Sequence, residues 1–479
     1  MRMMNAALWV SAVTLILAGW SAVADEPNRK EQIWEGKLTI GAGIELRMVF
    51  HIAKDEAGKF TATFDSPDQG AKGLKVDSVT LDGTHLVMEM KRILGKFEGA
   101  LNPDGTEAKG TWSQAGNRLP LSLKRVEQVS EARRPQTPMP PFPYKTEDVS
   151  YANAAGRVTL AGTLTLPAGP NAFPAVILIS GSGAQDRDES LLGHKPFLVL
   201  ADALTRRGIA VLRADDRGVG GSTGNTMNSN SDDFAGDVLA GIAFLKTRSE
   251  IDGSKIGLIG HSEGGLVAPM VAVRSPDVSF IVMMAGTGLP GDEIVPLQAR
   301  LIGQASLVDA KELARQLDFQ KRLLEIARTE PDDKIAEERA LAATKDWMAA
   351  MTEAERKNAG DLHARIAGQF KTLRSPWFRY FLSYDPRPTL GKVRCPVLAI
   401  VGEKDLQVPP KENLAEIETA LKQGGNTQFT IKELPGLNHL FQTSTTGAPS
   451  EYARIEETIA PSALTLIGDW IFEQTGKKP

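Results

Sequence analysis

The sequence predicts an α/β protein in which a mostly parallel sheet is covered by helices, preceded by a small antiparallel β-domain. From Val149 onward, near-continuous apolar runs alternate with helical segments, as expected for strands buried on both faces. From Gln32 to about Val126, short alternating runs are instead separated by turn residues such as Asp82-Gly83, which is typical of a small barrel or sandwich. We expect Trp34 and Trp112 to fill the core of that first domain.

The second region is expected to open with a hairpin at 158–166 and to continue as alternating strands and helices. Its buried strands are predicted at residues 174–179, 209–213, 256–259, 279–284, 396–401 and 428–434, and its helices at 196–207, 234–247 and 461–473. A long helical pattern at 291–390, rich in Ala, Leu, Glu, Lys and Arg, interrupts this order. We expect it to form a helical cap over the site described next.

A glycine-rich motif follows one of the predicted strands. Gly260-His261-Ser262-Glu263-Gly264 has the spacing G-x-S-x-G between a strand and a helix. The glycines are required because side chains two residues before and after the serine would collide with the neighbouring strand and helix. Ser262 is therefore predicted to be a nucleophile, and the Glu263 N–H at the start of the helix is expected to donate to a developing oxyanion.

Chain order indicates the base that would activate Ser262. In proteins with this motif, the acid and then the histidine follow the serine. Of the 6 histidines, only His363 and His439 come after Ser262. His363 lies in a helical stretch ahead of the strand that should carry the acid, whereas His439 follows the last predicted strand. We therefore predict that His439 takes and returns the Ser262 proton.

The acid is expected in the loop after the strand at 396–401. Asp405 lies there, Glu403 is a competing carboxylate in the same loop, and Asp292 after the preceding strand is a remoter one. A second oxyanion donor is expected from the loop at 180–189, where flanking glycines let the backbone approach the substrate and Ser182 N–H is the favoured donor.

Several motifs together resemble secreted bacterial α/β-hydrolases of the serine aminopeptidase and dipeptidyl-peptidase-like branches. They are Ser180-Gly-Ser-Gly-Ala-Gln-Asp-Arg-Asp188, Asp216-Arg-Gly218, Gly260–Gly264, Gly402-Glu-Lys-Asp-Leu-Gln-Val408 and Asn438-His439. The resemblance covers Val149 to the C-terminus and implies the α/β-hydrolase fold, Asp405 as the acid, and an activity similar to carboxylesterases of short acyl esters. One departure is that Ser180-Gly181 stands where the family has His-Gly before the oxyanion loop.

The first domain is similar to the small lipocalin-like β-domains that precede some bacterial hydrolases, through Gly99, Gly110 and Thr111-Trp112. At the other end of the cap pattern, Trp377, Phe378 and Tyr380 form an aromatic run close to the returning strand. We expect some of these three side chains to line the acyl pocket.

Composition narrows the functional classes. The chain has 479 residues, 42% of them hydrophobic, and a formal net charge of -4, so it lacks the basic surface that binds nucleic acid or anionic membranes. Its one cysteine, Cys395, excludes an internal disulfide. No spacing of histidines, cysteines or acids indicates a metal, and the loop at 215–224 lacks the pattern of a nucleotide site. We expect no cofactor.

The N-terminus has the features of a secretory signal peptide: Arg2, an apolar run at 6–20, and Ala22-Val-Ala24 before Asp25. The run is shorter than a membrane span needs, so an exported protein, periplasmic or extracellular, is expected. The predicted division is a signal peptide at 1–24, the β-domain at 25–128, a proline-rich linker at 129–148, the catalytic domain at 149–290 and 391–479, and the cap at 291–390.

The sequence thus predicts a serine hydrolase, most simply a carboxylesterase that acts on a small-molecule ester through an acyl-enzyme on Ser262. Two alternatives stay open. A peptidase of the same fold would need a fixed carboxylate cluster to hold a substrate amine. An exported binding protein without turnover would not need the complete set of Ser262, Asp405 and His439.

Overall fold

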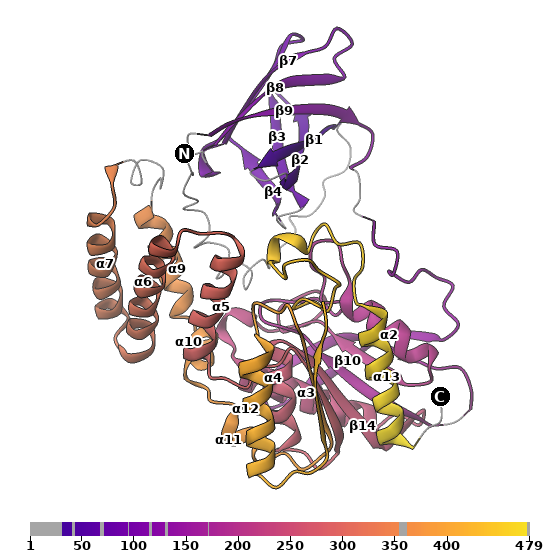
Figure 1. Ribbon diagram of the computed structural model, residues 1–479. Coiled ribbons are helices and arrows are strands. Elements are labelled where there is room, and N and C mark those ends of the chain that lie inside the picture. Colours follow the sequence, from indigo (N-terminus) through magenta and orange to yellow (C-terminus); the bar gives the residue numbers. More distant parts are fainter. Residues whose placement is uncertain are drawn as a thin grey trace.

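In the computed structural model, residues 31–476 are described, apart from 41–43, 68–70, 94, 115–116, 130–132, 171 and 354–361. The predicted signal peptide at 1–24 lies outside the described residues. The strands of these described residues form two separate sheets, of nine and eight strands. Figure 1 shows the first sheet above the second, with a group of helices beside them.

The first sheet is the predicted antiparallel β-domain. Its strands are β1 (Gln32–Ile40), β2 (Ile44–Lys54), β3 (Phe60–Ser66), β4 (Ala71–Val76), β5 (Ser78–Leu81), β6 (His85–Met90), β7 (Gly95–Leu101), β8 (Glu107–Gln114) and β9 (Asn117–Val126). Their order is β4-β3-β2-β1-β9-β8-β7-β6-β5. The sheet curls so that β5 also approaches β3, which gives it a barrel-like form. Trp34 and Trp112 are each 1% exposed inside it, as predicted.

The second sheet is mostly parallel, as predicted, and its strand order is β10-β11-β13-β12-β14-β15-β16-β17. Its strands are β10 (Lys145–Asn153), β11 (Val158–Leu166), β12 (Phe173–Ile179), β13 (Ala210–Ala214), β14 (Ile251–His261), β15 (Val278–Met284), β16 (Val397–Gly402) and β17 (Phe429–Leu434). β11 pairs antiparallel with both β10 and β13. From β13 to β17 in this order, each strand pairs in parallel with the next.

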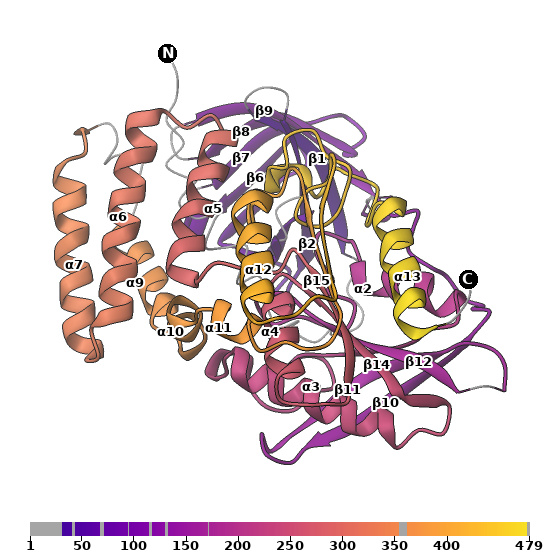
Figure 2. The ribbon, with the colours of Figure 1, turned by 60° about the horizontal axis from the view of Figure 1, so that its bottom comes forward.

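Helices cover both faces of this sheet. The helices are α2 (Pro196–Arg206), α3 (Ser231–Lys246), α4 (Glu263–Ala272), α12 (Pro410–Gln423) and α13 (Pro461–Thr475). Successive residues of β12 alternate between two cores. Ile177 belongs to the core that includes residues of α3, α4 and α12, and Val176 to the core that includes residues of α2 and α13. Figure 2 shows the two helix layers on either side of the sheet. This alternation explains why the strands are apolar throughout.

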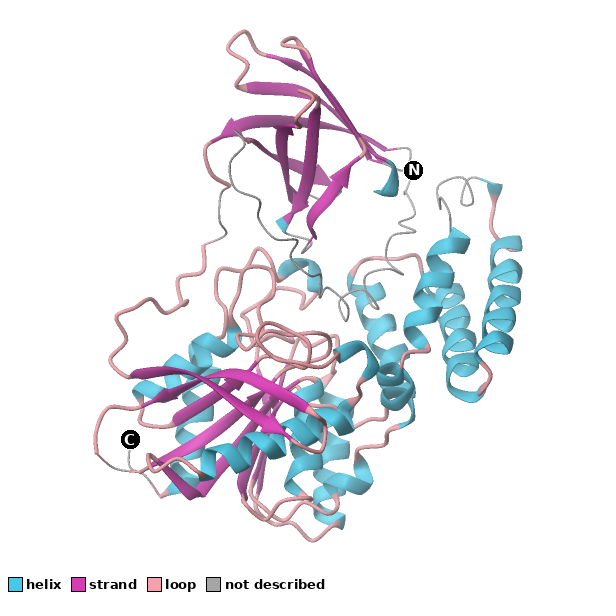
Figure 3. Ribbon diagram, turned by 180° about the vertical axis from the view of Figure 1, so that it is seen from behind, coloured by secondary structure: helices cyan, strands magenta, loops and turns pink. Residues whose placement is uncertain are grey.

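Between β15 and β16 the chain forms a group of helices with a core of its own. They are α5 (Gly291–Ala305), α6 (Ala310–Thr329), α7 (Asp333–Ala349), α9 (Leu362–Leu373), α10 (Pro376–Ser383) and α11 (Arg387–Leu390). Buried Phe319, Phe370 and Phe378 join this core. Figure 3 shows the contrast between this helical group, the strand-rich β-domain and the mixed α/β part. We refer to α5–α10 as the cap helices.

The proline-rich stretch before β10 is attached to the α/β part by hydrogen bonds. Arg134 donates to the carbonyl oxygens of Leu192 and Ala453, both at 2.8 Å, and Gln136 donates to that of Ile459 at 2.7 Å. β10 begins at Lys145, ahead of the expected domain start at Val149. Residues 145–148 are all polar and so conceal this strand start; an edge strand with one neighbour tolerates such a run.

Candidate active site

Ser262 lies on the predicted elbow between β14 and α4. Its backbone is strained, with φ 53° and ψ −114°. A Cβ atom at Gly260 would lie 1.9 Å from the Gly264 carbonyl oxygen, and one at Gly264 would lie 2.0 Å from that of Ile179. Only glycine fits at either position, which is the steric requirement that the motif implied.

A histidine and an acid lie beside the elbow, on the loops after β17 and β16. His439 Nδ1 is 2.8 Å from Asp405 Oδ2. Asp405 is 2% exposed, and its other oxygen accepts the backbone N–H groups of Gln407 and Val408, both at 2.8 Å. These bonds fix the carboxylate so that it orients the imidazole.

The competing candidates lie elsewhere. Glu403 accepts the N–H of Gly436 at 2.7 Å in an exposed position. Asp292 lies in the first turn of α5 and pairs with Arg328 at 3.5 Å, and His363 lies in α9. The structure therefore brings Asp405, and neither other acid, to His439.

One cleft contains both Ser262 and His439. Its apolar wall comes from the cap helices and the loops around the histidine: Ile294, Val295, Trp377, Phe381, Val408 and Leu440. Polar side chains complete it, among them Gln298, Gln407 and Tyr452. A serine and a histidine that line one mostly apolar cleft suit an acyl-transfer reaction.

Residues 176–455 of the chain match the model of the Alpha/beta hydrolase family. The chain belongs to the alpha/beta hydrolase family.

The individual proteins that the chain resembles have low sequence identity to it. The hydrolase is 27% identical over 282 residues to Esterase EstD of Thermotoga maritima, a match that covers 59% of this chain and 58% of that protein. The chain therefore spans less than two thirds of this relative. Among solved structures, alpha/beta hydrolase GrgF from a Penicillium species has 17% identity and a TM-score of 0.43, covering 69% of this chain and 99% of that one. An esterase of Pyrococcus furiosus has 15% identity and a TM-score of 0.41, covering 73% and 99%.

The two expected oxyanion donors lie at the cleft of the hydrolase. Glu263 is the first residue of α4, so its N–H has no acceptor within the helix. Ser182 lies on the loop after β12 and lines the cleft. The adjacent Gly181 N–H donates to Glu189 Oε1 at 2.7 Å, so it is already used inside the protein. Ser182 N–H stays the expected donor from this loop, because Gly181 N–H is engaged and Ser182 lines the cleft.

The Glu263 side chain has a role that the sequence did not indicate. It is 4% exposed, and its Oε1 accepts from Ser231 Oγ at 2.6 Å and from Trp377 Nε1 at 2.8 Å. Burial raises the pKa of this carboxyl, and hydrogen bonds from Ser231, Trp377 and Ser182 oppose that rise. The residue after Ser262 therefore joins the elbow to a cap helix.

The three aromatic residues expected at the pocket occupy different places. Trp377 lines the cleft, whereas Phe378 is fully buried in the core of the cap helices. Tyr380 packs against the main core and stacks on Tyr384, with ring centroids 5.5 Å apart. Phe381, one helical turn after Trp377, also lines the cleft. Its ring stacks on that of Trp377, with centroids 5.5 Å apart. Helical periodicity within the run is the signal that would have selected Phe381.

Two acidic residues, Asp215 and Asp216, form hydrogen bonds with the loop after β12. Asp216 accepts from Ser180 Oγ at 2.7 Å and from Gln185 N–H at 2.9 Å. Burial raises the pKa of Asp216 to about 8. Its neighbour Asp215 instead accepts two hydrogen bonds from the Arg187 side chain, at 3.0 and 2.7 Å.

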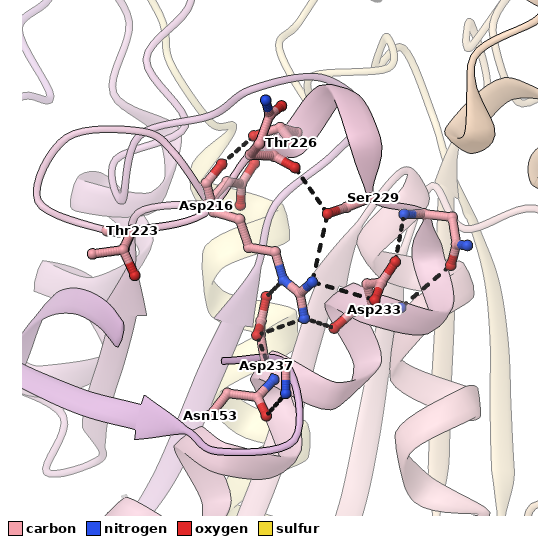
Figure 4. A network of polar contacts seen from close by, with 12 residues as sticks. Asn153, Asp216, Thr223, Thr226, Ser229, Asp233 and Asp237 are labelled. Carbon is pink, nitrogen blue, oxygen red and sulfur yellow. Dashed lines mark hydrogen bonds and ion pairs between the residues drawn. The ribbon is translucent and has the colours of Figure 1, made fainter. Parts of the chain in front are cut away.

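Arg217 anchors the same segment to α3. Its buried guanidinium donates to Asp237 at 3.1 Å and pairs with Asp233 at 3.2 Å, while Asn153 at the end of β10 donates to Asp237 at 2.7 Å (Figure 4). A guanidinium held by two carboxylates on one helix is rigid. The loop that carries Asp216 is thereby fixed relative to the sheet.

Within the described ranges, no group of three or more histidines, cysteines or acids is arranged to bind a metal ion. None of the helices in these described ranges has the length and apolar character that a membrane span requires.

Proposed function

We propose that the protein is a carboxylesterase that cleaves short to medium acyl esters through an acyl-enzyme on Ser262. The observation that carries the proposal is the strained elbow of Ser262 in one cleft with His439, whose Nδ1 faces buried Asp405 at 2.8 Å. The relative named Esterase EstD supports an ester as the substrate.

In the first half of the reaction, Ser262 Oγ attacks the ester carbonyl carbon while His439 Nε2 accepts the hydroxyl proton. The charge on the carbonyl oxygen is stabilised by the N–H groups of Glu263 and Ser182. His439 then returns the proton to the departing alkoxide, so that an alcohol leaves and the acyl group stays on Ser262. Asp405 keeps the imidazole in the required tautomer and stabilises its charged form.

In the second half, water attacks the acyl-enzyme. His439 accepts a proton from the water and passes it to Ser262 Oγ as the carbon–oxygen bond breaks. The products are a carboxylic acid and free enzyme. Every proton transfer in this cycle passes through His439.

The acidic side chains of the cleft favour an ester over a peptide substrate. In the described part of the chain, the acidic residues that line it are Glu189 and Glu263. Glu189 Oε1 lies 2.9 Å from His261 Nδ1, and Glu263 accepts from Ser231 and Trp377. An aminopeptidase needs carboxylates that are available to a substrate ammonium, and these two are already engaged.

The test is a burst-phase assay with nitrophenyl butyrate, run beside an aminoacyl nitroanilide and repeated with Ser262→Ala. We expect an ester burst with little amide turnover, and a fall in kcat of about a million-fold in the variant. Amide turnover that depends on Ser262 would replace the esterase with a peptidase. A folded protein that turns over neither substrate would point to a binding role.

We also propose that the protein is exported, on the basis of the signal-peptide pattern that ends at Ala24. Expression of the full chain in a bacterial host, followed by fractionation and N-terminal sequencing, tests this. A mature N-terminus at Asp25 in the periplasm or medium is expected, and an uncleaved cytoplasmic chain would contradict it.

A further inference from the structure

A second histidine lies next to the proposed base, His439. His261, the residue before Ser262, is 7% exposed, and its ring centroid is 5.0 Å from that of His439. Its Nδ1 lies 2.9 Å from Glu189 Oε1, and its Nε2 lies 3.0 Å from the backbone carbonyl oxygen of His439. Both ring nitrogens therefore face oxygen acceptors.

This geometry determines the protonation of the ring. A neutral imidazole carries one N–H and one lone pair, so one of its nitrogens would meet an acceptor without a proton between them. A protonated ring donates to both oxygens. Glu189 Oε1 also accepts the Gly181 N–H at 2.7 Å, so this oxygen is an acceptor and the proton between it and His261 Nδ1 is assigned to the ring.

The charges around the ring agree with this. Burial lowers the pKa of His261, but the charge and hydrogen bond of Glu189, the His439 carbonyl and the charge of Asp405 outweigh it, so the pKa is raised. Another buried histidine differs: His194 lies next to Thr458 and the Tyr452 carbonyl, and burial lowers its pKa to about 4.

We propose that His261 is a positioning residue which, as an imidazolium paired with Glu189, joins the backbone of His439 to the oxyanion loop. The connection runs from Gly181 N–H to Glu189, from Glu189 to the ring, and from the ring to the His439 carbonyl. One ring thus sets the base and the loop of Ser182 relative to the nucleophile next to it in the chain. The effect on turnover rests on the proposed acyl-enzyme reaction, whereas the protonation state does not.

The role predicts a second ionisation in the pH profile. When His261 loses its proton at alkaline pH, one of its two hydrogen bonds is lost and the base or the loop is released. We expect kcat to fall on the alkaline side with the ionisation of His261, while KM changes little. A displacement of reacting groups by about 1 Å is enough to reduce turnover up to about 100-fold.

The first measurement is the ¹⁵N NMR spectrum of the histidine rings in the full-length wild-type protein, with His261 assigned by its loss in His261→Asn. Both ring nitrogens of His261 should show imidazolium shifts at neutral pH, with His194 as a neutral reference in the same spectrum. In Glu189→Gln, which keeps an acceptor for Gly181 N–H, the ionisation of His261 should move to lower pH. A neutral His261 ring at pH 7 in the wild type would overturn the proposal.

Two substitutions of His261 test its hydrogen bonds to Glu189 and to the His439 carbonyl separately. Asparagine at 261 places its amide near the former Nδ1 and loses the bond to His439, whereas glutamine reaches the former Nε2 and retains it. We expect kcat with nitrophenyl butyrate to fall about 10- to 100-fold in His261→Asn, to recover largely in His261→Gln, and to lose the alkaline ionisation in both. Equal kcat in the wild type and the folded Asn variant would overturn the positioning role.

These results distinguish this proposal from the proposed function. If the wild type shows no ester turnover while NMR shows an imidazolium at His261, the esterase reaction fails and the ion pair stands. If ester turnover depends on Ser262 but His261 is neutral, the esterase reaction stands and the ion pair fails.

Discussion

The indole N–H of Trp377 in α10 donates a hydrogen bond of 2.8 Å to Oε1 of Glu263, the residue that follows Ser262. The position of a cap helix and that of the nucleophile elbow are therefore linked through one buried carboxyl group. Because the cleft lies between these two elements, the bond also sets how far the cap helices stand from the reacting serine.

Replacing Trp377 with phenylalanine removes this donor while keeping an aromatic ring. A buried carboxyl that loses one hydrogen bond should cost about 1–3 kcal/mol of unfolding free energy. The pKa of Glu263, already raised by burial, should rise further. We expect a lower unfolding midpoint and an altered ratio of kcat/KM between short and long acyl esters. Trp470→Phe, in α13 on the other face of the sheet, serves as the control, and an equal change of that ratio in the control would contradict the link.

Phe381 and Phe378 provide a second contrast within one helix. Phe381 lines the cleft, so Phe381→Ala should shift preference toward longer or bulkier acyl chains, measured as relative kcat/KM over a series of nitrophenyl esters. Phe378 is fully buried among the cap helices, so Phe378→Ala should cost about 3–5 kcal/mol of stability without changing that preference. If Phe378→Ala changed specificity and Phe381→Ala did not, the assignment of the two faces of α10 would be reversed.

The acid can be tested by comparing two carboxylates of one loop. Asp405→Asn should lower kcat by about 10,000-fold, because an asparagine favours the wrong tautomer of His439. Glu403→Gln should leave kcat within about twofold, since Glu403 is exposed and accepts the backbone N–H of Gly436, away from His439. Steady-state kinetics on both variants, with circular dichroism to confirm folding, gives the answer. A large loss of kcat in Glu403→Gln alone would move the acid to that residue.

The sequence could predict the features that depend on neighbouring residues and on chain order. The elbow needs only the glycines around Ser262, and the order of strands leaves His439 as the base. The choice of Asp405 over Glu403 came from the family resemblance, because both side chains follow the same strand. Which of them turns inward depends on the turn after β16, where Gln407 N–H and Val408 N–H bind Asp405.

Sequence patterns of this kind do not predict contacts between residues that are far apart in the chain. His261 and Glu189 are 72 residues apart, and Trp377 and Glu263 are 114 apart. Neither pair has a spacing that local periodicity can detect. In the aromatic run of α10, the expectation that some of Trp377, Phe378 and Tyr380 line the pocket left the helical phase open. That phase is set by packing of the cap helices on one another and on the sheet.

Asp216 predicts how stability depends on pH. Burial raises its pKa from the ordinary value of 3.8 to about 8, so the folded protein binds this proton more tightly than the unfolded chain. The stabilisation is therefore fully present below about pH 4 and is lost as the pH rises through about 8. Asparagine mimics the protonated acid, since its amide can donate to Ser180 Oγ while its oxygen accepts from Gln185 N–H. Asp216→Asn should thus gain stability relative to the wild type as the pH rises.

The measurement is urea unfolding followed by circular dichroism at several values between pH 5 and pH 9, with Asp215→Asn as the matched control. Burial of Asp215 is outweighed by its hydrogen bonds from Arg187, so its pKa is lowered and it stays ionised across this range in both states. The control should therefore be less stable than the wild type by the same amount at every pH. For Asp216→Asn the difference should grow with pH, and a constant difference would mean that Asp216 carries its charge in the folded protein at pH 5.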